Sequence, residues 1–150
     1  MPTLITRNGG SLSSVDYMRV VKKAVSDSVI DGCSMTKSGA AINITAGHIV
    51  ACGALVEIES ASMNVSASGE LVLKIDTTSE TPAQLLTRAS STLTQQDLTN
   101  GGTVYELRLA TYTVSSGNVS AISIKVPNSP TVYVQQAQPS SPSVGDLWFW

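Results

Sequence analysis

The chain has 150 residues, a formal net charge of −2 and only 13% charged residues. This length suits a single domain that can bury a sizeable core without disulfide staples. The weak charge excludes the clustered Lys and Arg that nucleic acid binding requires, so we expect no nucleic-acid partner.

The sequence shows no pattern that would direct the protein to a membrane. Residues 1–7 lack the apolar run of a signal peptide. The longest apolar stretch, 49–56, is interrupted by Gly53 and is too short to span a bilayer. We therefore expect a chain made in a cytosol and without membrane association. A reducing cytosol favours free thiols, so Cys33 and Cys52 are interpreted as small core residues, with a disulfide or a metal ligand as the alternative.

The first predicted element is an amphipathic helix that follows an N-terminal arm. Within the arm, residues 1–12, the segment 4–6 forms either a short strand or an extended stretch. Ser13 followed by Asp16 is an acidic variant of the capping box and predicts a helix over 14–26. The helix has an apolar stripe, formed by Met18, Val21 and Val25. Its charged face carries Arg19, Lys22 and Lys23.

From residue 29 onward apolar and polar residues alternate, which is the period of strands. Residues 42–46 predict one strand, and Gly47 with His48 predicts a turn. A single strand is then expected over 49–58. Its second face is apolar over the first half, which indicates a central strand or a strand buried by another subunit. That face carries the candidate oligomer-interface residues Ile49, Ala51, Gly53 and Leu55.

The middle of the chain is harder to interpret. Residues 63–65 and 71–76 predict two strands joined by a turn at 66–69. Residues 77–102 are interpreted as a long crossing or an extended loop. A short helix that starts at Pro82 is the alternative.

Residues 103–113 and 119–126 alternate cleanly and predict a β-hairpin. We expect residues 131–134 to add an edge strand. Together these elements predict a mainly β fold: an antiparallel β-sandwich or a small barrel-like meander, with one N-terminal amphipathic helix and an extended C-terminal tail. The β-rich domain spans 13–130, and the tail spans 131–150.

Residues that could carry chemistry are sparse. His48 is the only histidine, so a His-rich metal site is excluded, and a Ser/His/Asp triad would have to use it. Its predicted place at a turn favours a solvated or backbone-bonded imidazole. Glu57 and Glu59 resemble a glycosidase pair in residue type alone and are interpreted as a solvated face. No glycine-rich phosphate loop is present. We expect no catalytic residue, no metal site and no cofactor, and therefore not an enzyme.

The tyrosines admit two interpretations. They are expected to be core or interface residues, and an exposed carbohydrate-binding platform is the alternative. The four residues are Tyr17, Tyr105, Tyr112 and Tyr133.

The last part of the chain combines a charge-free, Pro/Ser/Gln-rich run, 135–144, with an aromatic end. Both tryptophans and the only phenylalanine lie in the final three positions. Exposed aromatic side chains need a partner, or a groove on their own domain, to cover them. We therefore interpret this end as a partner-docking anchor formed by Leu147, Trp148, Phe149 and Trp150.

Two segments resemble proteins of bacteriophage tails. Residues 29–53 read VIDGCSMTKSGAAINITAGHIVACG. With the short helix before it, this segment resembles the N-terminal domain of tail-fibre and baseplate proteins, especially in phages and phage-tail-like particles of Gram-positive bacteria. Residues 139–149, PSSPSVGDLWF, are similar to a segment common in phage fibre proteins. The first likeness extends over 13–60.

The resemblance implies a structural protein of the virion, assembled in the cytoplasm of a bacterial host. It implies a homotrimer, other phage structural proteins as partners, and a host surface glycan as a further ligand. Because no receptor-binding tip domain follows, we expect an adaptor of the tail tip, baseplate or fibre attachment. A host-receptor or glycan-binding protein and a head or neck fibre are the alternatives, with an enzyme last. The first segment implies a β-meander punctuated by glycines: Gly32 and Gly39 at turns, Gly47 at the end of the second strand, and Gly53 at a close backbone approach in the third.

Overall fold

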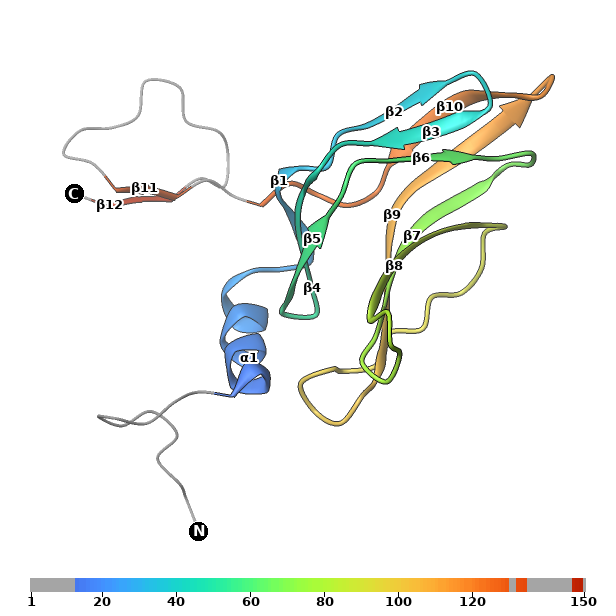
Figure 1. Ribbon diagram of the computed structural model, residues 1–150. Helices are drawn as coiled ribbons and strands as arrows, with labels where there is room; N and C mark the ends of the chain where they lie inside the picture. The colour runs from blue at the N-terminus through green and yellow to red at the C-terminus, as the bar shows by residue number, and fades with distance from the viewer. Residues whose placement is uncertain (1–12, 130–131, 135–146, 150) are drawn as a thin grey trace, which may run out of the picture.

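The computed structural model describes residues 13–129, 132–134 and 147–149, and within them the protein is mainly β. Among these residues one helix precedes twelve strands, and the sheets of the domain are antiparallel and do not close into a barrel (Figure 1). The predicted fold class, a β-sandwich or meander with one N-terminal helix, is confirmed. The elements are α1 (Ser14–Ala24), β1 (Ser28–Gly32), β2 (Met35–Ser38), β3 (Ala41–Ile44), β4 (Gly47–Ala51), β5 (Ala54–Ile58), β6 (Ala61–Asn64), β7 (Gly69–Asp76), β8 (Ala83–Arg88), β9 (Val104–Ser115), β10 (Asn118–Ile124), β11 (Val132–Val134) and β12 (Leu147–Phe149).

The helix begins with the predicted capping box. The Ser13 hydroxyl accepts a hydrogen bond from the Asp16 backbone N–H, and the Asp16 carboxylate accepts one from the Ser13 N–H. The box fixes the start of α1 because it satisfies N–H groups that have no partner within the helix. The helix ends at Ala24, before the predicted Ser26, because Val25 already has an extended backbone.

Six short strands form one bent, three-stranded meander. β4 pairs with β1 and β5, while β3 pairs with β2 and β6. Because β1 leads into β2, β3 into β4 and β5 into β6, each pair is one long strand interrupted at a bend. Hydrogen bonds join the three bends into a row across the sheet. The meander implied by the glycine-punctuated segment is therefore present.

The bend depends on backbones that approach too closely for a side chain. The Cys33 N–H donates to the Ala46 carbonyl oxygen at 3.2 Å. A Cβ at Gly32 would lie 2.0 Å from that same oxygen, so only glycine fits there. The predicted turn at Gly47 and His48 is wrong. Both residues lie in β4, and the bend comes just before them.

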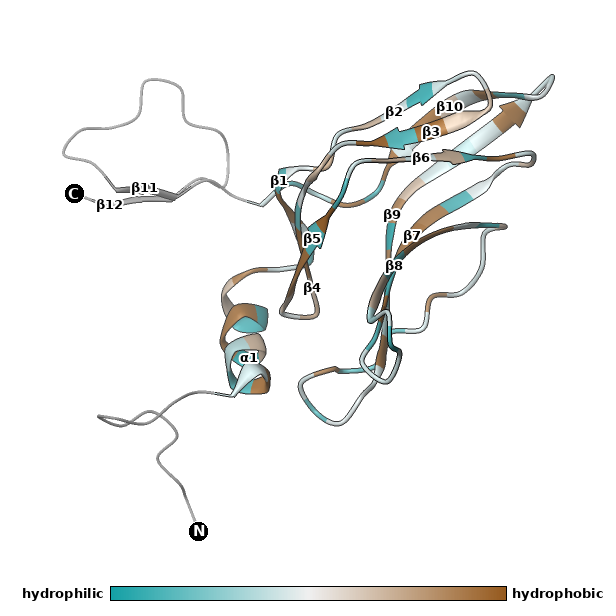
Figure 2. Cartoon of the chain, viewed as in Figure 1, coloured by the Kyte–Doolittle hydropathy of each residue, from teal (hydrophilic) through white to brown (hydrophobic). Residues whose placement is uncertain are grey.

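The predicted single strand over 49–58 is also wrong, because the chain reverses in its middle. β4 and β5 form a hairpin whose two turn residues, Cys52 and Gly53, have φ values of 49° and 79°. Two consecutive positive φ values occur in type I′ turns, whose twist matches that of the flanking strands. A Cβ at Gly53 would lie 2.1 Å from the Met18 carbonyl oxygen, so the turn packs directly against α1. Figure 2 shows how apolar this hairpin is.

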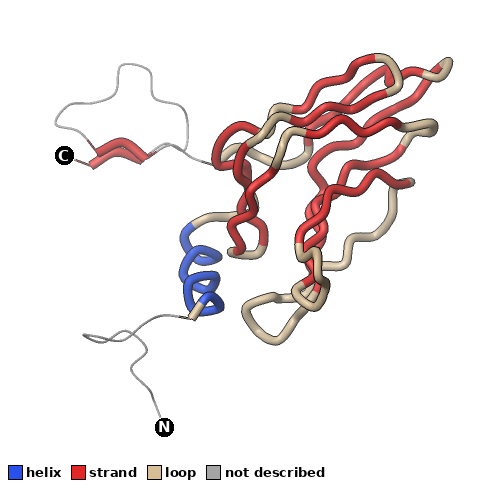
Figure 3. The backbone as a smooth tube through the Cα atoms, viewed as in Figure 1, coloured by secondary structure: helices blue, strands red, loops and turns tan. Residues whose placement is uncertain are grey.

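The second sheet has the strand order β10-β9-β7-β8. β9 and β10 form the predicted hairpin. The long crossing expected over 77–102 is wrong in part, because residues 83–88 form β8 and pair along β7. The alternative of a helix that starts at Pro82 is wrong for the same reason. The rest of that region comprises the short β7–β8 connection, 77–82, and the long loop between β8 and β9, drawn in tan in Figure 3. The turn expected at 66–69 links β6 to β7 and so carries the chain from one sheet to the other.

The core lies between the bent meander and the second sheet, which meet along one side (Figure 1). There the Val119 N–H donates to the Gly39 carbonyl oxygen at 2.9 Å, and the Val29 N–H to that of Pro127 at 2.8 Å. On the opposite side, β5, β6 and β8 are edge strands with no further strand beside them in the part of the chain that the structure describes. The sandwich is therefore closed along one side and open along the other. The largest apolar side chains that are fully buried in the core are Ile42, Ile44, Ile49, Leu71, Leu73 and Leu109.

Candidate docking surfaces

The single histidine is paired with one carboxylate. His48 in β4 and Asp31 in β1 are cross-strand partners, and His48 Nδ1 lies 2.9 Å from Asp31 Oδ1. The hydrogen bond and charge of Asp31 raise the pKa of His48. Glu57 lies opposite His48 in β5, and both it and Glu59 are exposed, as expected of a solvated face. The arrangement is an exposed His–Asp pair on the surface of the meander.

Replacing Asp31 with asparagine should return the pKa of His48 to its ordinary value, as followed by NMR titration of the imidazole. A raised folded pKa means that the pair stabilises the fold below the unfolded pKa of His48. That contribution is lost as the pH rises through the folded pKa. As a control, Glu59→Gln should leave the titration in place. An unchanged titration in Asp31→Asn would show that another group sets the pKa.

A polar cluster fastens α1 and the β4–β5 turn to the second sheet. The Cys52 N–H donates to the Asp27 carboxylate at 2.7 Å, and the Tyr105 hydroxyl donates to the same carboxylate. Lys22 Nζ lies 2.8 Å from Asp97 Oδ1. Burial and the hydrogen bond to Asp27 raise the pKa of Tyr105, whereas the Lys22 ammonium lowers that of Asp97. No buried side-chain nitrogen or oxygen of the described residues lacks a hydrogen-bond partner, so the cluster serves the fold.

The cysteines and two of the four tyrosines belong to the core or pack against it. Cys33 and Cys52 are buried free thiols, which confirms their interpretation as core residues, and burial raises the pKa of Cys33. Tyr112 is buried, and Tyr105 packs against the core. Tyr17 is 59% exposed. The side chain of Tyr133 lies outside the described part of the structure. The three tyrosines whose side chains are described do not form an exposed platform.

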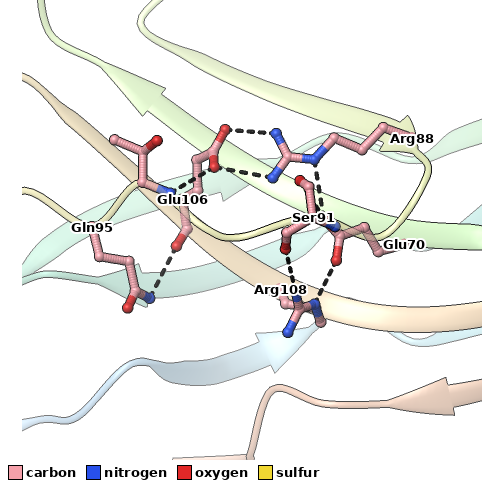
Figure 4. A network of polar contacts seen from close by, with 7 residues as sticks. Glu70, Arg88, Ser91, Gln95, Glu106 and Arg108 are labelled. Carbon is pink, nitrogen blue, oxygen red and sulfur yellow. Dashed lines mark hydrogen bonds and ion pairs between the residues drawn. The ribbon is translucent and has the colours of Figure 1, made fainter.

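A buried ion network lies on the second sheet beneath the β8–β9 loop (Figure 4). Glu70 is fully buried and accepts hydrogen bonds from Arg88 at 3.0 Å and from Arg108 at 2.6 Å. The buried Glu106 accepts two more from the Arg88 guanidinium, at 2.8 and 3.0 Å. Two backbone N–H groups of the loop also donate to the carboxylates, that of Ser91 to Glu70 and that of Thr94 to Glu106.

The network holds the β8–β9 loop against the second sheet. Burial raises the pKa of Glu70, but hydrogen bonds from Arg108 and Arg88 outweigh it and hold that pKa below the ordinary value. Arg88 likewise lowers the pKa of Glu106. In the sequence, Glu106 and Arg108 share the strand face opposite Tyr105, Leu107 and Leu109. Strand periodicity alone cannot show that a loop covers this face.

The four candidate interface residues are not equivalent. Ile49 and Ala51 are 0% exposed within the single chain, and Gly53 is buried against α1. The chain itself thus covers these three residues, because Ile49 and Ala51 lie in the hydrophobic core and the turn that contains Gly53 packs against α1. Leu55 is 66% exposed and is the one of the four that a partner could still cover.

The helix also leaves apolar side chains in solvent. Its predicted stripe faces the domain, where Met18 packs against the core and Val21 is half-buried. Elsewhere on α1, Tyr17 and Val20 are 59% and 63% exposed. Clustered exposed apolar side chains are typical of docking surfaces.

The predicted docking anchor forms a strand. β12 runs parallel to β11, with Trp148 opposite Tyr133. The two strands form a sheet of their own, apart from the sandwich (Figure 1). The strand expected at the start of the tail is present as β11, but its partner is β12. Trp150 and most of the tail lie outside the described residues.

Other kinds of site find little support. Within the described residues, no group of three or more His, Cys, Asp or Glu side chains could hold a metal ion. In that same part of the chain, no helix has the length and hydropathy needed to cross a membrane. No model of a known protein family matches the chain, and a search of curated proteins finds no match either.

Proposed function

We propose that the protein is a structural component of a bacteriophage tail, an adaptor in the baseplate, tail tip or fibre attachment of the virion. It acts as a homotrimer that docks on other phage structural proteins, and it catalyses no reaction. The two segments that resemble tail-fibre and baseplate proteins support this assignment. They coincide with the bent meander, at 29–53, and with the segment that ends in β12, at 139–149.

The observation that carries the proposal is the parallel pair β11–β12. A two-stranded sheet alone is marginally stable in water, and parallel sheets normally have both faces covered. Neither strand has a second neighbour among the described residues. The paired residues are Val132 with Leu147, Tyr133 with Trp148, and Val134 with Phe149, all apolar or aromatic in type. Such a pair needs a partner surface.

A partner can complete this sheet in two complementary ways. A strand of the partner can pair with a free edge, which gives affinity through main-chain hydrogen bonds. Pockets for tryptophan and phenylalanine then give specificity, because large aromatic side chains dominate the energetics of interfaces. Both features fit a protein that is assembled into a larger particle.

Replacing Trp148 and Phe149 with alanine should lower incorporation into particles by at least about tenfold, since loss of one interface hot spot costs about 2 kcal/mol or more. Quantitative blotting of purified particles measures this. The thermal unfolding of the isolated domain should not change. Ile124→Ala, which removes an exposed apolar side chain from β10, is the matched control. Normal incorporation of the double variant, or binding of the isolated domain to host cells or glycans in place of virion proteins, would contradict the proposal.

A further inference from the structure

The open side of the sandwich contains a groove. It lies between β5–β6 of the meander and β7–β8 of the second sheet and has a volume of about 360 Å³. The apolar residues of its floor are Val56, Ile58, Leu73 and Leu85. Its only charged lining residues are acidic, Glu57 and Glu59. A single extended segment with one aliphatic side chain directed inward matches this shape.

Two sheet edges border the groove. β5 and β8 each pair on one side alone within the described residues, so their outer N–H and C=O groups face the opening. Unpaired edges are templates for an added strand. Leu55, exposed on β5, adds an apolar side chain that such a strand would cover.

We propose that residues 3–7 of the N-terminal arm, Thr-Leu-Ile-Thr-Arg, add a strand to β5 and fill this groove. The inference is independent of the proposed virion role. In an extended segment, Ile5 and Arg7 share one face and Leu4 lies on the other. Leu55 and Glu57 are exposed on β5. A cross-strand pair of Arg7 with Glu57 would put Arg7 and Ile5 on that outer face and Leu4 in the groove.

The charge of the N-terminal arm fits the acidic groove better than the charge of the C-terminal tail does. Arg7 is the only charged side chain among residues 1–12, whereas Asp146 is the only one among residues 135–150. The groove is lined by two glutamates and no cation. A cross-strand Arg–Glu pair is favourable, while an aspartate beside these carboxylates is not.

The arm is long enough to reach. The path from the end of the arm to the groove is roughly 20 Å long. It follows α1 from Ser13 to Met18, crosses to the neighbouring Gly53, and follows β5 to Val56. The link from Arg7 to Ser13 can itself span roughly 20 Å when extended. The near end of the groove is therefore within reach of the same chain, and equally open to a neighbouring copy.

Disulfide trapping tests the contact. The pair Leu4→Cys and Ala83→Cys should form a cross-link under mild oxidation, and electrophoretic mobility shows whether one chain or two are joined. The natural cysteines are buried and do not compete. The control pair is Leu4→Cys with Ser123→Cys, an exposed position on β10 at the closed side of the sandwich. Equal cross-linking of both pairs, or none with Ala83→Cys, would overturn the proposal.

Hydrogen exchange of the full-length chain provides the second test. Deleting residues 2–7 should speed exchange of the edge amides of β5 by about tenfold, the factor that corresponds to one lost hydrogen bond. Arg7→Glu should do the same without shortening the chain, and adding Glu57→Arg should restore the protection. Unchanged exchange after the deletion, or protection that instead disappears on removal of residues 146–150, would show that the arm is not the occupant.

Discussion

Replacing Glu70 with alanine is expected to lower the free energy of unfolding by about 3–5 kcal/mol. The carboxylate is fully buried and lies between Arg88 and Arg108. Its removal leaves two partly buried guanidinium groups without their shared partner and takes an acceptor from the Ser91 N–H. Denaturant unfolding of the purified chain, with the slope compared between variants, measures the effect.

Two further variants separate the causes. Glu59→Ala removes an exposed carboxylate and should change the free energy by no more than about 0.5 kcal/mol. Glu70→Gln keeps the shape and removes the charge, so its cost should fall between the two. If Glu70→Ala costs no more than Glu59→Ala, the network does not hold the β8–β9 loop.

The same network should make the fold sensitive to acid. Arginine partners hold the pKa of Glu70 and of Glu106 below the ordinary value of 4.5. The stabilisation is therefore complete above the unfolded pKa and is lost as the pH falls through the lower, folded values. Unfolding curves measured from about pH 7 to about pH 3 should show this loss, and Glu70→Gln should flatten it. An equal loss in that variant would assign the acid sensitivity to other carboxylates.

Gly32→Ala should destabilise the domain by about 3 kcal/mol or more. The residue has a φ of 55°, and an added Cβ would lie 2.0 Å from the Ala46 carbonyl oxygen. Backbone lies on both sides of this contact, so neither strand can move without breaking the row of hydrogen bonds at the bend. Thermal or denaturant unfolding of the variant checks the prediction.

Gly101→Ala is the matched control for backbone strain. Gly101 has a φ of 83°, and nothing lies within 4 Å of its added Cβ. Its substitution should cost only about 1–2 kcal/mol, the price of a left-handed conformation without a clash. If both variants unfold alike, the close approach at the bend contributes nothing beyond the backbone conformation.

Local patterns were sufficient wherever one short segment determines the structure. The Ser13–Asp16 spacing predicted the start of α1, because a capping box involves only neighbouring residues. The alternation over 103–113 and 119–126 predicted the β9–β10 hairpin for the same reason. The glycines of the segment 29–53 predicted the meander, although they could not show that its strands bend.

The structure differs from the predictions where contacts between residues far apart in the sequence determine the local conformation. The turn at Cys52 and Gly53 lacks the usual Asn-Gly or Asp-Gly signal, and its apolar flanks continue one strand pattern, so one long strand was expected. Ile49 and Ala51 were assigned to a subunit interface because periodicity shows that two faces are apolar, but not what covers them. The Glu70 network was missed because its partners come from three strands and a loop. The pairing of β12 with β11 crosses twelve intervening residues, 135–146, which carry no strand pattern.

The closed side of the sandwich has a consequence for the order in which the protein folds during synthesis. The Ser129 N–H donates to the Val29 carbonyl oxygen, so the edge of β1 is completed by residues made a hundred positions later. Until those residues leave the ribosome, the nascent meander carries two open edges, and long-range pairing of this kind is slow and prone to aggregation. A stalled chain that ends before Pro127 should therefore be more sensitive to protease than one in which Ser129 has emerged from the exit tunnel.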